Sequence, residues 1–163
     1  MAKTLIFPTL FLCLTVQTFG QQLGLDFRET DQHGVSVKHL DSIYKSAVHV
    51  DTSLAVFKTE KEQEMMYNAY VQLLQEFGKT LTANDFRWDK PTRCFNRIYF
   101  NKNGTIDYFL FNFIGKTAED KPSEEKQIEF QKLLNIFIAG YRFPLTSKVK
   151  FAQCSPTTYM PKE

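Results

Sequence analysis

The chain has 163 residues, of which 43% are hydrophobic and 23% are charged, which suits one ordinary domain and is too short for two. Aromatic residues make up 15% of the chain, which excludes a disordered tail. Its 20 basic and 18 acidic residues leave a net charge of +2, without the basic surplus of nucleic-acid-binding proteins. We therefore expect one packed domain and no nucleic-acid partner.

The first 20 residues have the pattern of a secretory signal peptide. Lys3 precedes an uncharged, largely apolar stretch that reaches Val16, and small residues near Gly20 predict cleavage before Gln21. The alternative is an uncleaved membrane anchor, but Pro8 and other residues interrupt the stretch, which falls short of the ~20 apolar residues of a spanning helix. We expect a periplasmic or secreted protein with no stable membrane anchor after cleavage.

The rest of the chain divides into two parts. Residues 21–58 contain short, ambiguous patterns, so their structure stays open. Residues 59–163 predict an α+β domain with two helices. The first begins at a capping box, Thr59-Glu60-Lys61-Glu62, and is expected to end at Gly78. The second is expected from Ser123 to Gly140, because acidic residues open it and an apolar stripe follows.

Three strands are expected around these helices. Two aromatic runs, Arg93 to Phe100 and Thr105 to Ile114, flank Asn103-Gly104, which predicts a hairpin because both turn residues tolerate positive φ. Lys148 to Cys154 alternates like a last strand. The order helix, strand, strand, helix, strand predicts a small antiparallel sheet with helices packed on one face. A right-handed return of the last strand gives the strand order 2-1-3.

Two cysteines, Cys94 and Cys154, remain after the predicted cleavage. In the order 2-1-3 the first strand begins beside the end of the last strand, which brings both residues to one end of the sheet. In an oxidising compartment this predicts a disulfide between them. The alternative is two unrelated thiols, because cysteine is often buried as a small apolar residue.

The hairpin from Asn96 to Phe111 and the sequence Tyr141-Arg142-Phe143-Pro144 after the second helix carry a family resemblance. On these motifs residues 93–154 resemble the TonB C-terminal domain. The sequence departs from that family in having no residue between Phe143 and Pro144. The resemblance implies a periplasmic domain that binds an extended peptide from a partner by strand pairing.

The predicted hairpin has two different faces, because alternate residues of a strand share a side. One face carries enough phenylalanine to be the floor beneath the helices. The other is aromatic and contains an arginine, a composition enriched in binding surfaces. The residues we expect to contact a ligand or partner are Arg97, Tyr99, Tyr108, Leu110 and, beyond the hairpin, Trp88. The alternative is that residues 21–57 fold over this face and bury it.

The strand Thr105 to Ile114 carries only one charge, Asp107, and would aggregate unless another strand pairs with its edge. We therefore expect a non-enzymatic module that binds a protein or extended peptide through the aromatic face or an open strand edge. One alternative is a small ligand carrier or enzyme with a site between the sheet and residues 21–57, using Arg87, Trp88 and Arg97 as contacts. A third is a structural subunit that forms homo-oligomers.

No motif in the sequence predicts catalysis, a cofactor or a metal. The three histidines, His33, His39 and His49, have no zinc-site spacing. Gly115-Lys116-Thr117 follows a strand, but Leu110 stands where a phosphate-binding loop needs its first glycine. We assign no catalytic residue.

Overall fold

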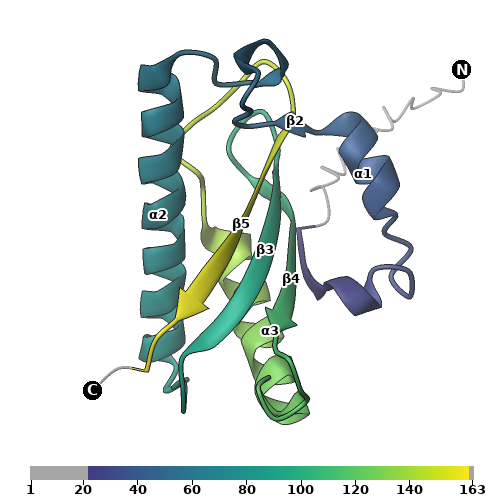
Figure 1. The fold of residues 1–163 in the computed structure, drawn as a ribbon, viewed down its shortest axis with the longest axis vertical. Coiled ribbons are helices and arrows are strands. Elements are labelled where there is room, and N and C mark those ends of the chain that lie inside the picture. The colour runs from purple at the N-terminus through teal and green to yellow at the C-terminus, as the bar shows by residue number, and fades with distance from the viewer. Residues whose placement is uncertain (1–21, 162–163) are drawn as a thin grey trace, which may run out of the picture.

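The structure is a computed structural model that describes residues 22–161, so the predicted signal peptide lies outside the described residues. One sheet and three α-helices are described (Figure 1). The elements in chain order are β1 (Leu23–Asp26), η1 (Phe27–Glu29), α1 (Val37–Ile43), β2 (Lys45–Ser46), η2 (Thr52–Leu54), α2 (Glu60–Ala83), β3 (Thr92–Phe100), β4 (Ile106–Ile114), α3 (Glu124–Gly140) and β5 (Phe151–Tyr159).

The sheet is larger than predicted and mixed. Its five strands follow the order β1-β4-β3-β5-β2, and both outer strands run parallel to their neighbours. The prediction of a small antiparallel sheet of order 2-1-3 is therefore wrong. Within the sheet, β3 pairs antiparallel with β4 on one side and with β5 on the other. The two unforeseen strands lie in residues 21–58 and are too short, at 4 and 2 residues, to show a strand period.

The predicted disulfide is also wrong, because the register of β3 and β5 separates the two cysteines. Cys94 lies opposite Thr157, whereas Cys154 lies opposite Arg97. This offset of three residues is about 10 Å along the strand. An odd offset also places the two side chains on opposite faces of the sheet. Both cysteines are free, Cys94 buried and Cys154 exposed.

α2 and α3 cover one face of the sheet, which we call the first face (Figure 1). Phe130 of α3 lies at the centre of this core, with ring centroids 4.9 Å from Phe111, 5.1 Å from Phe113 and 5.2 Å from Phe77 of α2. α1 packs against the other face, which we call the second face and to which β1 contributes Leu25.

α2 begins at the predicted capping box but continues past Gly78 to Ala83. Glycine inside a helix costs about 1 kcal/mol relative to alanine, and the buried side chain of Leu81 extends the apolar stripe beyond it. The packing therefore outweighs the stop signal at Gly78. No helix in residues 22–161 is long and apolar enough to cross a membrane.

Candidate binding surface

The second face is covered in one half and open in the other. In the covered half, Tyr99 and Leu110 are fully buried and Tyr108 is half-buried. The residues that pack on them come from the N-terminal segment: Leu25, Val35, Leu40 and Tyr44. This half of the face therefore lies under residues of the N-terminal segment, and neither Tyr99 nor Leu110 is accessible to a partner.

Arg97 lies at the boundary between the two halves. Its guanidinium forms an ion pair with Asp41 of α1 and lies 5.6 Å from the ring centroid of Tyr99. The hydroxyl of Tyr99 donates a hydrogen bond to the same carboxylate at 3.0 Å. Burial, above all, raises the pKa of this hydroxyl. Asp41 thus holds Arg97 and Tyr99 together at the end of the covered half.

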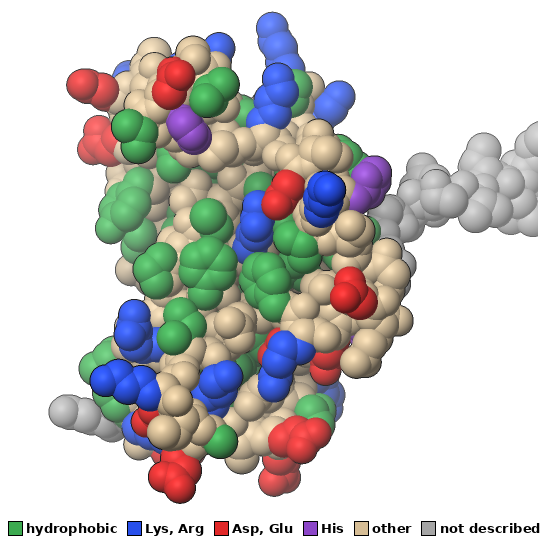
Figure 2. Space-filling model, turned by 45° about the vertical axis from the view of Figure 1, so that its right-hand side comes forward, with side chains coloured by type: hydrophobic (Ala, Val, Ile, Leu, Met, Phe, Trp, Pro, Cys, Tyr) green, Lys and Arg blue, Asp and Glu red, His purple; other side chains and the backbone are tan. Residues whose placement is uncertain are grey.

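The open half of the second face continues from Arg97 toward the far end of the sheet. Its members share the side of Arg97 by strand register: Arg93, Phe95, Asn112, Ile114, Cys154, Pro156 and Thr158. The ring of Phe27 lies 6.3 Å from that of Phe95. Figure 2 shows hydrophobic side chains gathered in the middle of the molecule, with Lys and Arg side chains above and below them.

Trp88 lies on the first face, apart from the other predicted contact residues. Its ring stacks on that of Tyr159 with centroids 5.0 Å apart, and it also packs against Phe130. Trp88 lines an open groove of about 360 Å³ between α2 and the last residues of β5, which we call the α2/β5 groove. The groove also contains Val71, Leu74 and Tyr159.

β5 has a free edge along most of its length. β2 pairs only with Phe151 and Ala152, so no strand in the described part of the chain lies outside Gln153–Tyr159. The Ala47 N–H donates to the Ala152 carbonyl at 2.8 Å, which shows that the even-numbered residues direct their backbone groups outward. The outward backbone groups of Pro156 and Thr158 and the Cys154 N–H therefore face solvent, whereas the Cys154 carbonyl accepts from the Gln153 side-chain amide at 3.1 Å, and all three residues are exposed. We call the outer side of Gln153–Tyr159 the β5 edge.

The edge that the sequence singled out is covered instead. β1 pairs with Tyr108 to Phe111 of β4. The free side of β1 is in turn occupied by the Asn135 side chain of α3, which accepts from the Gly24 N–H at 2.9 Å and donates to the Gly24 carbonyl at 3.0 Å. A side-chain amide here takes the place of a neighbouring strand.

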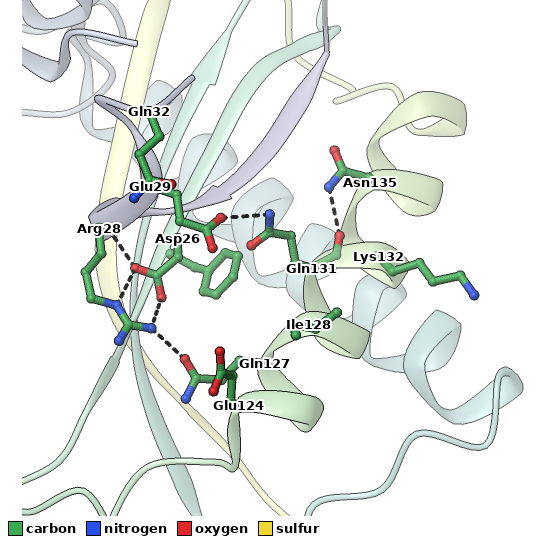
Figure 3. Close-up of a pocket in the computed structure, with 11 residues that line it drawn as sticks. Asp26, Arg28, Glu29, Gln32, Glu124, Gln127, Ile128, Gln131, Lys132 and Asn135 are labelled. Atoms are coloured by element: carbon green, nitrogen blue, oxygen red, sulfur yellow. Dashed lines mark hydrogen bonds and ion pairs between the residues drawn. The ribbon is translucent and has the colours of Figure 1, made fainter. Parts of the chain in front are cut away.

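Between η1 and α3 lies an open cavity of about 690 Å³ (Figure 3). The Asp26 carboxylate accepts two hydrogen bonds from the Arg28 guanidinium, at 2.9 and 2.8 Å, and these raise the pKa of Arg28. Arg28 also donates to Gln127 at 2.7 Å, and Gln131 donates to Glu29 at 3.0 Å. These polar groups are hydrogen-bonded to one another. We therefore interpret them as structural contacts that hold the N-terminal segment against α3, and not as a binding site.

A second polar cluster fixes the other end of that segment. Asp107, which is buried, accepts from the Tyr44 hydroxyl at 2.6 Å and from Lys150 at 2.8 Å. Burial and the bond to Asp107 raise the pKa of Tyr44. The cluster joins the end of α1, the hairpin and the start of β5. Asp107, which we expected on an open edge, is therefore a structural anchor.

A smaller cavity of about 330 Å³ brings Arg97, Asp41, Tyr44 and Cys154 together. Its only acid is Asp41, whose carboxylate pairs with Arg97. Neither a histidine nor a second carboxylate lines it, and residues 22–161 contain no group of three or more metal ligands. The buried thiol, Cys94, has its pKa raised to about 12 by burial, which makes it unreactive near neutral pH.

Comparison of this chain with protein-family models, curated proteins and solved structures finds no match. The resemblance to the TonB C-terminal domain therefore stays a prediction. Sequence reasoning missed Pro156 and Thr158 because the last strand was expected to end at Cys154. The β-prone run Thr157-Thr158-Tyr159 is the signal that could have revealed them.

Proposed function

We propose that this chain is an exported, non-enzymatic binding module that takes up an extended segment of a partner protein as an additional strand at the β5 edge. The observation that carries this proposal is that no strand of the described residues pairs with the outer side of Gln153–Tyr159 in an otherwise well-packed sheet. Strand addition draws its affinity from main-chain hydrogen bonds and its specificity from alternate side chains.

The surroundings of the β5 edge favour an added strand. The outward-facing residues Cys154, Pro156 and Thr158 are small and exposed, so a backbone can approach them closely. One side of the added strand would meet the open half of the second face, and the other side would meet the α2/β5 groove. Both sets of side chains would then have a surface to contact.

A second copy of the chain fits this edge less well than a different partner. A two-fold pairing of the β5 edge with itself about Pro156 sets two prolines opposite each other. Proline has no N–H, so the carbonyl of each Pro156 would face a ring nitrogen and lack a donor. A partner residue that carries an N–H at that position satisfies the Pro156 carbonyl and leaves one carbonyl without a donor instead of two, which favours a heterologous segment over self-association in this register.

Amide hydrogen exchange tests the proposal on the folded chain. Without peptide, the Cys154 and Thr158 amides should exchange fast, whereas the Ser155 and Thr157 amides, which face β3, should exchange slowly. An acetylated octapeptide that alternates Val and Gln serves as a neutral probe. At saturating concentration it should slow both outward amides, and unchanged exchange would contradict the proposal.

A matched pair of variants separates strand addition from other binding at this surface. Thr158→Pro removes an outward N–H without touching the bonds to β3, so it should weaken peptide binding about five- to tenfold, the effect of one lost hydrogen bond of about 1–1.5 kcal/mol. Thr158→Val keeps the backbone and should bind like the unmodified chain. Equal affinities of the two variants, measured by fluorescence anisotropy, would show that the backbone of β5 does not contribute.

A further inference from the structure

We infer that the partner segment alternates acidic and apolar side chains, the acidic ones over the second face and the apolar ones in the α2/β5 groove. This inference rests on the proposed strand addition and specifies the chemistry of its partner. Its basis is the different character of the two surfaces that border the β5 edge.

The second face is basic beside the β5 edge. Arg93 and Arg97 flank Phe95 on β3, and their register partners on β5 are Thr158 and Cys154. Arg97 has one carboxylate partner, Asp41, whereas Arg93 is exposed and forms no ion pair with any described residue. No carboxylate belongs to the open half of this face, so a bound segment would supply the missing negative charge.

The distances allow such contacts. An added strand lies about 4.8 Å from β5 and therefore about 10 Å from β3. The residues between them, Cys154 and Thr158, are small and leave room above the sheet. A glutamate on the added strand and an arginine on β3 can reach toward each other across them, and guanidinium groups suit carboxylates in geometry as well as charge.

The opposite side of the added strand faces an apolar surface. The α2/β5 groove is lined mainly by apolar side chains such as Val71, Leu74 and Trp88. Arg87 also lines it, and its guanidinium donates to the backbone carbonyls of Thr82 and Phe86. Tyr67, one turn before Val71 on α2, is 67% exposed. Because alternate residues of a strand face opposite sides, a segment that satisfies both surfaces must alternate apolar and acidic residues.

Three acetylated octapeptides labelled with fluorescein test the inference: repeats of Val-Glu, of Val-Lys and of Val-Gln. The Val-Glu peptide should bind at least about fivefold more tightly than the Val-Lys peptide, as expected for one or two exposed charge pairs, and added salt should reduce the difference. A Ser-Glu peptide, without apolar side chains for the groove, should bind more weakly than Val-Glu.

Charge-reversal variants give the matched control. Arg93→Glu should abolish or reverse the preference for Val-Glu, whereas Arg142→Glu, the same charge change at the exposed Arg142 by the hairpin turn, should leave it intact. Tighter binding of Val-Lys, with protection of the Cys154 and Thr158 amides, would overturn the acidic partner and leave strand addition standing. No protection by any of the peptides would overturn the proposed function itself.

Discussion

The two edges of the sheet differ in how completely they are covered. On one side β1 covers β4, and Asn135 then occupies the free side of β1 with hydrogen bonds to both backbone groups of Gly24. On the other side β2 covers only Phe151 and Ala152, and the rest of β5 is left open. The closed side shows that this fold can protect an edge with one side chain from a helix, and within residues 22–161 no helix side chain forms a hydrogen bond with the backbone of the β5 edge.

Pro156 lowers the tendency of the exposed β5 edge to pair with other copies of the chain. Natural proteins use proline on edge strands to oppose self-pairing, and Pro156 removes one of the outward donors. Cys154, one outward position away, has its carbonyl occupied by the Gln153 amide at 3.1 Å. The edge is thus restrained against indiscriminate pairing but keeps the N–H groups of Cys154 and Thr158.

The largest change in stability is expected from replacing Asn135, which caps the outer side of β1. Asn135→Leu leaves the Gly24 N–H and carbonyl without their partner in a part-buried position, and each unsatisfied group costs about 1–3 kcal/mol. We expect a loss of about 3 kcal/mol in the free energy of unfolding, measured by urea denaturation. Asn135→Asp keeps an acceptor for the N–H but sets a carboxylate oxygen against the Gly24 and Gln131 carbonyls, so it should also destabilise the chain. Equal stability of Asn135→Leu and the unmodified chain would show that the edge needs no cap.

A smaller effect is expected from the glycine that lets α3 approach β1. A Cβ on Gly24 would lie 2.8 Å from Cδ2 of Leu134, too close for a real contact. Gly24→Ala should therefore cost about 1–3 kcal/mol through overpacking. Gly78 offers the matched control, because a Cβ there meets nothing within 4 Å, and Gly78→Ala inside α2 should stabilise by about 0.5–1 kcal/mol. Opposite signs in thermal denaturation confirm the comparison, and the same sign contradicts it.

The contrast between the two edges also shows which parts of the fold could be predicted from the sequence. Long periodic segments gave the helices and the Asn103-Gly104 hairpin, because many residues share one pattern there. β1 and β2 are too short to show a period and exist through pairing with strands far along the chain. Tyr99 and Leu110 lie beneath the N-terminal segment, as in the alternative that the aromatic composition of this hairpin face suggested, although no pattern within the segment itself shows where it packs.

The smallest effect concerns the two thiols, one on each side of the sheet. Cys154 is exposed beside the β5 edge, whereas burial raises the pKa of Cys94 to about 12, so Cys94 stays a protonated, shielded thiol at pH 8. Iodoacetamide should label Cys154 in the folded chain within minutes and leave Cys94 unmodified until urea unfolds the protein, as peptide mapping by mass spectrometry can show. Cys154→Ser should change stability by less than about 0.5 kcal/mol, the usual limit for an exposed position. Labelling of Cys94 at the rate of Cys154 would mean that the first face is open to solvent, and the contrast between a packed interior and a single free edge would then fail.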